Sequence, residues 1–330
     1  MKTVACILNE CSETTIPIEN FMLLDDNEFH KCLVVFNATQ QELHEFLDKN
    51  YPQKKVLLYG LGKLKLLQKY FKTKKILKQI APSIVHAHHT SSAALSYLAK
   101  VGNNEIKFIF TLHSCYAAYN FKQKLVYLFL YQVADKLIAN SKNTKNSIPN
   151  VIKKEKIEVI YNGVNIEKLQ YSNQKDLEKN VFSFGTISRL TPQKDHVTLI
   201  KAFAKFIKEN NLQGKVRLYI VGDGHLKKNL LNLVNKLHIN SDTVFTGLLS
   251  RGGAYSYLKS FDIFVVSSIF EGFCNSMVEA MFAKKIIIAS DIDPFPEVLG
   301  EGNGLFFKVK DAEDLALKMK DVYEEKLQTG

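Results

Sequence analysis

Short runs of consecutive apolar residues recur along this chain, and they restrict its possible folds more than any other feature. Residues 32–36 and 263–266 are two such runs. Between the runs lie longer segments with apolar residues at helical spacing, as in residues 197–209. Strands with one face in water alternate apolar and polar residues, whereas uninterrupted apolar strands are typical of parallel sheets covered by helices on both faces. The pattern therefore predicts a doubly wound α/β protein.

The alternation of strand and helix extends over two halves of the chain. In the first half the expected strands are residues 3–8, 32–36, 55–59, 83–86, 108–112, 136–139 and 157–161, and the expected helices are 41–48, 63–80, 91–100 and 122–133. In the second half the expected strands are residues 181–185, 216–221, 243–245, 263–266, 285–289 and 304–307, and the expected helices are 197–209, 224–237, 253–260, 275–283 and 312–327. A chain of 330 residues is long enough for each half to form its own domain.

A polar stretch over residues 165–180 divides the two halves. We therefore predict an N-terminal Rossmann-like domain over residues 1–168, a linker over residues 169–180 and a C-terminal Rossmann-like domain over residues 181–330. Ligands of doubly wound sheets bind beyond the carboxyl ends of the strands. The functional residues are thus expected directly after strands, in a cleft where the two domains face each other.

Composition is that of an ordinary globular protein in a reducing compartment. Hydrophobic residues make up 46% of the chain and charged residues 23%, as in typical soluble domains. The five cysteines are scattered without a CxxC pair, so free thiols are expected. The first residues begin a strand and lack a secretory signal pattern, and no apolar run reaches the length of a membrane span. We expect a cytoplasmic protein.

Two carboxylates, Glu271 and Glu279, bracket a turn and the start of a helix at about Asn275. A helix N-terminus offers free N–H groups and the positive end of the helix dipole, which suit a phosphate group. The flanking carboxylates suit neutral hydroxyls, such as those of a sugar or a ribose. This one segment can therefore hold both halves of a nucleotide sugar.

Two cations follow the expected strand at residues 181–185. Arg189 and Lys194 lie on either side of a proline turn, just before the next helix. Cations near a helix N-terminus suit a diphosphate, although a pair of ordinary surface cations fits the same pattern equally well. Gly222 and Gly224 follow the next strand, and without a third glycine they are interpreted as tight turn formers rather than as a dinucleotide motif.

Histidines follow two strands of the first half. His113 comes directly after residues 108–112, where a side chain can hydrogen-bond a substrate hydroxyl, although a lone histidine is more often structural. His86, His88 and His89 end another strand. No acid or cysteine lies at a spacing that completes a metal site with them, so no metal is predicted.

The segment from Lys63 to Ile80 is a basic helix. Residues 54–78 hold nine lysines and no acid, and Leu66, Leu67 and Phe71 are among the apolar residues that recur at helical spacing. One interpretation is a helix packed on the core with a solvated lysine face. Another is a helix that binds anionic lipid, where each lysine near the surface contributes about 1 kcal/mol. Nucleic acid is not expected as a partner, because the chain has no RNA-binding motif and no zinc-finger spacing.

The motifs together resemble those of the retaining glycosyltransferases of family 4, which have the GT-B fold. The motifs in chain order are Ala139-Asn140-Ser141, Tyr161-Asn162-Gly163, Gly185-x3-Arg189-Leu190-x3-Lys194, Val221-Gly222-Asp223-Gly224, Phe245-Thr246-Gly247 and Glu271-x7-Glu279. The resemblance covers residues 84–317, and its specificity comes from the whole set rather than from any one motif.

The resemblance implies a role for each candidate site residue. Arg189 and Lys194 would bind the diphosphate of the donor, and Glu279 would bind the ribose hydroxyls. His113 and Glu271 would contact the transferred sugar as the catalytic pair. The backbone that would assist Glu271 belongs to Gly272, Phe273, Cys274 and Asn275. No metal or cofactor is implied, since the leaving phosphate is expected to take the proton of the acceptor in a front-face attack.

Two positions depart from the family pattern. The loop after the first strand, residues 9–15, has no glycine where the family has a glycine-rich loop near the diphosphate and the acceptor. Cys274 replaces a small residue or proline, which leaves the backbone N–H in place. The resemblance also favours membrane binding by the Lys63 to Ile80 helix, because family members with lipid-linked acceptors commonly dock through a basic helix of the N-terminal domain.

These features together predict a retaining, metal-independent hexosyltransferase on the inner face of the cell membrane. Its donor would be a UDP- or GDP-linked sugar, and its acceptor a lipid-linked or surface glycan such as a lipopolysaccharide. A nucleotide-sugar epimerase of the same shape and an inactive sugar-nucleotide-binding protein are the alternatives. A Rossmann oxidoreductase is the weakest one, since no full dinucleotide motif is present.

Overall fold

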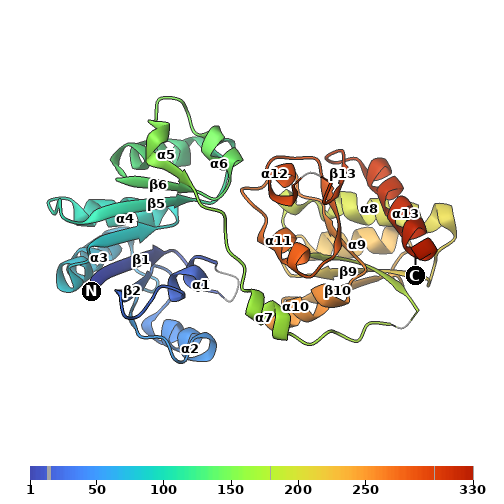
Figure 1. Ribbon diagram of the computed structural model, residues 1–330, viewed down its shortest axis with the longest axis horizontal. Helices are drawn as coiled ribbons and strands as arrows, with labels where there is room; N and C mark the ends of the chain where they lie inside the picture. Colours follow the sequence, from blue (N-terminus) through green and yellow to red (C-terminus); the bar gives the residue numbers. More distant parts are fainter. Residues whose placement is uncertain (13–15, 179, 301, 330) are drawn as a thin grey trace. The chain divides into compact units, whose positions relative to one another are not determined.

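The computed structural model describes residues 1–12, 16–178, 180–300 and 302–329. The chain forms two compact units, Met1–Gly163 and Val164–Gly330, and each has its own parallel sheet (Figure 1). The C-terminal unit begins with helix α7 (Ile166–Tyr171), in the stretch expected to hold the end of the first domain and the start of the linker. The predicted fold class, two doubly wound parallel-sheet α/β domains, is confirmed.

The N-terminal unit has a seven-stranded sheet in the order β3-β2-β1-β4-β5-β6-β7, and all neighbours are parallel. Its strands are β1 (Lys2–Leu8), β2 (Phe29–Val35), β3 (Val56–Gly60), β4 (Ile84–Ala87), β5 (Lys107–Leu112), β6 (Lys136–Ala139) and β7 (Ile157–Val159). Its helices are α1 (Ile16–Met22), α2 (Gln40–Asn50), α3 (Leu66–Ile80), α4 (Thr90–Lys100), α5 (Phe121–Val133) and α6 (Lys142–Ser147), with 3₁₀ turns η1 (Tyr116–Ala118) and η2 (Lys154–Lys156).

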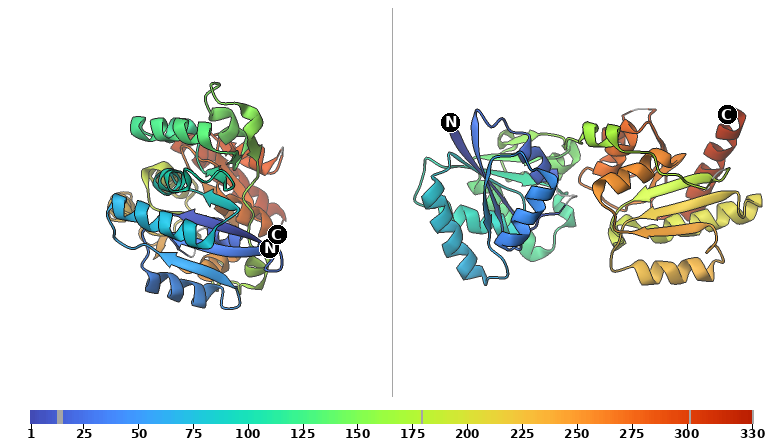
Figure 2. Two further views of the ribbon diagram at one scale, coloured as in Figure 1. Left: turned by 90° about the vertical axis from the view of Figure 1, so that its left-hand side faces the viewer. Right: turned by 90° about the horizontal axis from the view of Figure 1, so that it is seen from below.

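Both faces of this sheet are buried, which explains the uninterrupted apolar runs. Ala5 and Ile7 of β1 belong to a core with residues of α3, α4 and α5, whereas Val4 and Cys6 belong to a core with residues of α1 and α2. Successive side chains of a strand point to opposite faces, so a strand covered on both sides needs apolar residues at every position. Helices α3, α4 and α5 follow one another in a single layer (Figure 2).

The C-terminal unit has a six-stranded parallel sheet in the order β10-β9-β8-β11-β12-β13. Its strands are β8 (Phe182–Ile187), β9 (Val216–Val221), β10 (Thr243–Gly247), β11 (Ile263–Val266), β12 (Ile286–Ser290) and β13 (Leu305–Phe307). The helices after α7 are α8 (His196–Asn210), α9 (Lys227–Lys236), α10 (Arg251–Ser260), α11 (Asn275–Phe282), α12 (Phe295–Leu299) and α13 (Ala312–Thr329), with the 3₁₀ turn η3 (Pro192–Lys194). Alternate residues of β11 again enter different cores, Ile263 on one face and Phe264 on the other.

The sequence prediction missed the short helices, and it left open which apolar residues of one long helix are buried. Helices α1, α6, α7 and α12 have five to seven residues, too few for a helical period to be recognised. Helix α3 buries only Thr73, Ile76 and Leu77. Three apolar residues of its N-terminal half are more than half exposed, namely Leu66, Leu67 and Phe71. Helix α3 thus packs on the core through its C-terminal half and exposes most of its lysines, as one interpretation expected, and its N-terminal apolar residues remain exposed.

Two further sequence expectations concern membranes and cysteines. Within the described parts of the chain, no helix is both long and apolar enough to span a bilayer. The five cysteines carry free thiols, and Cys6, Cys32 and Cys274 are buried.

Candidate functional site

A pocket opens in the C-terminal unit where the strand order changes direction. Strands β9 and β10 lie on one side of β8, and β11 lies on the other, so the carboxyl ends of β8 and β11 form the switch point at which doubly wound folds bind ligands. The pocket is lined by Thr186, Ile187, Ser188, Lys194, Val266, Ser267, Ser268 and Ser276. Its walls thus combine one cation with several hydroxyl groups, a lining that suits an anionic polar ligand.

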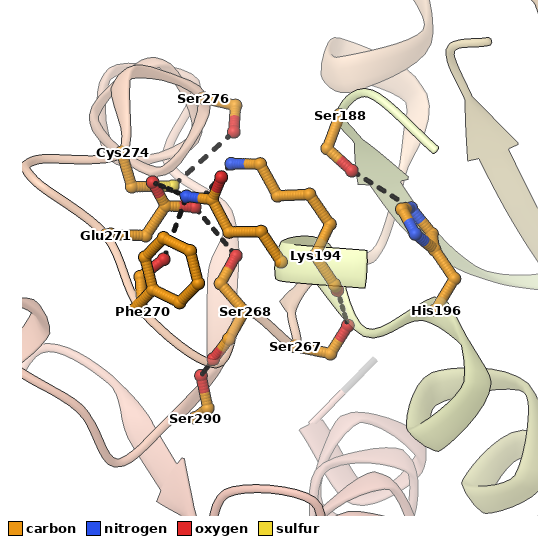
Figure 3. Close-up of polar contacts among 11 residues, drawn as sticks. Ser188, Lys194, His196, Ser267, Ser268, Phe270, Glu271, Cys274, Ser276 and Ser290 are labelled. Carbon is orange, nitrogen blue, oxygen red and sulfur yellow. Dashed lines mark hydrogen bonds and ion pairs between the residues drawn. The ribbon is translucent and has the colours of Figure 1, made fainter. Parts of the chain in front are cut away.

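Lys194 and Glu271 form an ion pair at this pocket (Figure 3). The Lys194 ammonium donates a hydrogen bond to Oε1 of Glu271, and both side chains are largely buried. Ser268 Oγ donates to the same oxygen at 2.8 Å, and Gln193 Nε2 donates to Oε2 at 3.2 Å. Both oxygens of the carboxylate therefore accept hydrogen bonds. A lysine has three donor hydrogens, so Lys194 can contact a phosphate and Glu271 together.

Backbone contacts hold the two partners of this pair, which are 77 residues apart in the chain. Ser267 Oγ donates to the carbonyl oxygen of Lys194 at 2.8 Å, and the Ile269 N–H donates to the carbonyl of Gln193 at 2.8 Å. Gln193 Nε2 also donates to the carbonyl of Phe270 at 2.9 Å. These bonds join the turn after β8 to the loop after β11, which positions Lys194 against Glu271.

Burial and neighbouring charges determine the protonation states of Lys194 and Cys274. Burial disfavours the charged form of Lys194, but the net effect of its surroundings, among them the hydrogen-bonded Glu271 carboxylate, is to raise the pKa of the ammonium. Burial raises the pKa of the Cys274 thiol to about 11. At neutral pH Lys194 is therefore a cation and Cys274 a neutral thiol, so the pocket presents a protonated lysine to a ligand.

A left-handed residue connects the loop to α11. Cys274 has φ 73° and ψ 78° at the position before the helix, a conformation that non-glycine residues rarely adopt. Phe273 and Cys274 are buried, and Ser276 in the first turn of α11 lines the pocket. Helix α11 begins at Asn275, as predicted from the sequence, and its N-terminus thus borders the pocket, where its dipole favours an anion.

The second glutamate of the motif lies in a buried cluster that the sequence did not reveal. Arg251 Nη2 donates to Oε1 of Glu279 at 2.6 Å, and the Tyr255 hydroxyl donates to the same oxygen at 3.1 Å. Arg251 Nε in turn donates to the Tyr255 hydroxyl at 2.7 Å. All three side chains are buried. The ribose contact of Glu279 stays a prediction. The structure shows in addition that Arg251 holds the Glu279 carboxylate in place.

One signal in the sequence points to Arg251. The chain has 44 basic lysine and arginine residues, of which the arginines are Arg189, Arg217 and Arg251. Arginine is preferred over lysine where a carboxylate must be held in a fixed orientation inside a protein. In a lysine-rich chain a rare arginine is thus a candidate for a positioned contact, and a search by residue type would have selected it.

Arg189 lies on the exposed side of the loop after β8. Its side chain is exposed, and its positive charge acts to lower the pKa of Lys194, against the net shift. The next residue, Leu190, is fully buried and anchors the loop in the core. Of the two predicted diphosphate cations, Lys194 therefore lines the pocket and is held by Glu271, whereas Arg189 faces solvent near enough for its charge to act on Lys194.

Gly222 and Gly224 have a role beyond the tight turn expected from the sequence. Gly222 has φ +139°, and a Cβ atom there would lie 2.0 Å from the carbonyl oxygen of Ser188. A Cβ on Gly224 would lie 2.5 Å from the carbonyl oxygen of Leu190. The turn after β9 therefore packs directly on the backbone that carries Ser188 and Arg189, and side chains at these positions would displace the pocket wall.

A buried histidine supports another pocket residue. His196 Nε2 lies 3.0 Å from Ser188 Oγ (Figure 3). Burial, followed by the charge of Lys194, lowers the pKa of His196 to about 4, so the imidazole is neutral at physiological pH. The sequence prediction did not single out this pair, because only the turn of η3 brings the helix start back to the end of β8.

His113 lies in the N-terminal unit, in a cluster of histidines at the carboxyl ends of β4 and β5. His88 Nδ1 lies 3.2 Å from His113 Nε2, and His86 Nε2 lies 2.7 Å from Thr111 Oγ1. Burial is the main cause that lowers the pKa of His86 to about 4 and of His113 to about 3. These imidazoles are neutral near pH 7, so His113 can exchange a hydrogen bond with a hydroxyl without carrying charge.

The remaining predictions about the N-terminal unit are tested only in part. Of the glycine-free loop at residues 9–15, residues 13–15 lie outside the described part of the chain. The Asn9 N–H donates to His89 Nδ1 at 3.4 Å, which joins the end of β1 to the histidine cluster at the switch point of this sheet. Among the described residues, no three His, Cys, Asp or Glu side chains are placed to hold a metal ion.

Comparison with known proteins identifies the family of both units. The sequence profile of the family described as "Glycosyl transferases group 1" matches residues 165–329, and that of "Glycosyltransferase Family 4" matches residues 27–168. A glycosyltransferase of Methanocaldococcus jannaschii is 28% identical over 257 residues, which are 72% of this chain and 62% of that protein. The chain thus spans less than two thirds of the length of this relative.

A second relative is also a glycosyltransferase, and a solved structure has the same fold as this chain. The UDP-Gal:alpha-D-GlcNAc-diphosphoundecaprenol alpha-1,3-galactosyltransferase of Escherichia coli is 28% identical over 298 residues, which are 84% of this chain and 76% of that protein. The structure of Anabaena HepE in complex with UDP and glucose matches with a TM-score of 0.82 at 18% identity, over 100% of this chain and 92% of that one. The two profiles and the two parallel sheets agree, and the chain belongs to glycosyltransferase family 4, whose members have the GT-B fold.

Proposed function

We propose that this protein transfers a hexose, with retention of anomeric configuration, from a UDP- or GDP-linked donor to a lipid-linked or surface-polysaccharide acceptor. The observation that carries the proposal is the pocket at the end of β8 and β11, where Lys194, Glu271 and the N-terminus of α11 converge. A cation and a helix N-terminus suit the diphosphate of the donor. Glu271 is placed beside them to accept hydrogen bonds from the hydroxyls of the sugar.

Catalysis without a bound metal is part of the proposal. Lys194 and Arg189 supply two positive charges, and the α11 dipole adds a partial one. Such preorganised charge stabilises a leaving diphosphate in the way that a magnesium ion does in other transferases. Both oxygens of Glu271 already accept hydrogen bonds from Lys194, Ser268 and Gln193, which holds the carboxylate in a positioning role. We therefore assign the proton of the acceptor to the leaving phosphate.

The relatives support the proposed donor and acceptor classes. The E. coli relative is named for UDP-Gal as donor and for a diphosphoundecaprenol-linked sugar as acceptor, and HepE was solved with UDP and glucose. A UDP-hexose is therefore the first donor to test, with its GDP counterpart as the second. An acceptor with a polyprenyl diphosphate fits a role in surface polysaccharide or lipopolysaccharide synthesis.

A transfer assay tests the activity. The protein is incubated with a radiolabelled UDP-hexose and a polyprenyl-diphosphate sugar, with and without EDTA, and the product linkage is determined by NMR. We expect an α-linked product from an α-linked donor and an unchanged rate in EDTA. A rate that falls to background in EDTA would contradict the metal-free mechanism. Conversion of the donor sugar without any acceptor would identify an epimerase instead, and binding without turnover would identify an inactive protein.

We also propose that the protein binds the cytoplasmic face of the membrane through α3. Lys72, Lys74, Lys75 and Lys78 are exposed on this helix, and Leu66, Leu67 and Phe71 are exposed apolar residues of its N-terminal half. A helix that only packs on the core would bury these three residues. Exposed apolar side chains beside lysines are typical of helices that lie in a lipid interface.

Removal of these four lysines should weaken membrane binding. The variant with Lys72, Lys74, Lys75 and Lys78 changed to serine should lose up to about three orders of magnitude in affinity for vesicles with anionic lipid, because each lysine contributes about 1 kcal/mol. Co-sedimentation at low salt measures this loss. The matched control changes four exposed lysines of the C-terminal unit to serine, Lys201, Lys208, Lys228 and Lys236. Equal losses in both variants would show that only net charge matters and would contradict a specific role of α3.

A further inference from the structure

Helix α5 has apolar residues on two opposite faces. One face packs in the core of the N-terminal unit, and the other bears Phe121, Leu125 and Phe129, which are 75%, 54% and 42% exposed. These three residues, called the α5 stripe below, recur every four residues and therefore lie on one side of the helix. The buried residues of α5 are Tyr127, Leu130 and Tyr131. Two exposed phenylalanines and a leucine in one line form an apolar surface that is largely open to solvent.

The α5 stripe belongs to the same helix layer as α3. Helices α3, α4 and α5 are successive neighbours on one face of the seven-stranded sheet (Figure 2). The ring of Phe129 packs edge-on against Tyr97 of α4, with 5.5 Å between ring centroids. The stripe is thus the outer surface of a layer whose other end is the basic helix α3.

The charge of this layer is of one sign. Helices α3, α4 and α5 contain eight lysines and no acid. Helix α5 itself contains Lys122 and Lys124 and no acid. The partner of the α5 stripe must therefore accept apolar side chains and must be negatively charged.

We propose that the α5 stripe inserts into the apolar boundary of an anionic membrane, as a second contact beside α3. An anionic lipid surface offers acyl chains to the phenylalanines and phosphate groups to the lysines. A second copy of this chain would bring two basic layers together, which like-charge repulsion disfavours. A nucleic acid has phosphates but no apolar surface of this kind along its backbone. The inference rests on the membrane contact proposed for α3 and extends it to a second helix.

Tryptophan fluorescence tests the insertion directly. The chain contains no tryptophan, so Phe121→Trp and Leu125→Trp each introduce a single fluorophore at an exposed position. With vesicles of phosphatidylglycerol and phosphatidylcholine, we expect a blue shift and quenching by brominated acyl chains. The control is Leu317→Trp on α13, where Leu317 is 53% exposed. Its emission should not change with vesicles.

A second variant measures the contribution to binding. Phe121→Ser/Leu125→Ser should weaken vesicle affinity by about tenfold for each side chain, since burial of a phenylalanine or leucine contributes that much or more. Nucleotide affinity and thermal unfolding should stay unchanged, because both residues are exposed. The loss should persist at high salt, where the contribution of the α3 lysines is screened.

The outcomes separate this inference from the membrane role of α3. If the unmodified protein sediments with vesicles but tryptophan at 121 and 125 shows no shift, the α5 insertion is wrong and the α3 contact stands. If the protein does not sediment at all, both are wrong. A blue shift without vesicles that grows with protein concentration would identify a second copy as the partner and overturn the insertion.

Discussion

Lys194→Ala is expected to lower the rate of sugar transfer by about two to three orders of magnitude, which is the usual effect of removing one preorganised donor to a developing charge. The same variant should also lose stability. Lys194 and Glu271 are 15% and 9% exposed, and breaking a buried ion pair leaves the carboxylate without its cation at a cost of about 3–5 kcal/mol. The measurements are kcat with a UDP-hexose donor and the free energy of unfolding in urea.

Arg189→Ala is the matched control for this prediction. Arg189 is exposed, and the structure records no side-chain hydrogen bond or ion pair for it within the described residues. Its removal should therefore lower the transfer rate without a change in stability. Lys194→Arg should restore stability more than it restores rate, because a guanidinium can pair with Glu271 but places its charge differently. A Lys194→Ala variant with normal kcat would exclude Lys194 from the diphosphate site.

Arg251→Met is expected to destabilise the C-terminal unit by about 3–5 kcal/mol, because it leaves the buried Glu279 without its cation. The two side chains are 9% and 10% exposed, so water cannot replace the lost contact fully. Nucleotide affinity should fall as well, since Glu279 keeps the Tyr255 hydroxyl but loses the cation that helps to orient it toward the predicted ribose. Urea unfolding and calorimetry with UDP measure the two effects.

Two further variants test whether the effect of Arg251→Met comes from the buried pair with Glu279. Arg217→Met removes another arginine, but its partner Glu178 is 51% exposed and can be rehydrated, so a cost of about 1 kcal/mol or less is expected. Glu279→Gln keeps the shape of the side chain but leaves the buried Arg251 without its carboxylate, so it should cost stability as well as weaken UDP binding, and UDP affinity is compared only in folded protein. Unchanged UDP affinity in a folded Glu279→Gln protein would remove the ribose role from Glu279.

Sequence patterns predicted the regular elements well because each depends on near neighbours. The apolar run at residues 263–266 became β11, and the periodic segment at 197–209 became α8 (His196–Asn210), with Asp195 as its N-terminal cap. A helical period needs several turns to be recognised, so α12 with five residues was missed. The spacing of apolar residues in α3 was read correctly, but spacing does not tell whether a neighbouring element covers them.

The sequence argument from strand ends predicted only part of the candidate site. Residues that follow strands can be identified from the sequence, and the parallel sheet brings the residues after β8 and β11 to one edge. That argument selected Lys194 and Glu271. It could not select Arg251, which lies at the start of a helix and reaches Glu279 across 28 residues. Nor could it select His196, whose contact with Ser188 depends on the path of the chain through η3.

The sequence by itself determined the alternation of elements, the parallel character of both sheets and the positions of the motif residues relative to strand ends. Only the tertiary structure decided which charges pair and which apolar side chains stay exposed. Lys194 meets Glu271 and Arg251 meets Glu279 because the order of strands in the sheet places their loops and helices together. The α5 stripe is largely open to solvent because it lies on the face of α5 opposite the core. Local periodicity depends on residues three or four positions apart, whereas pairing and exposure depend on how distant segments pack.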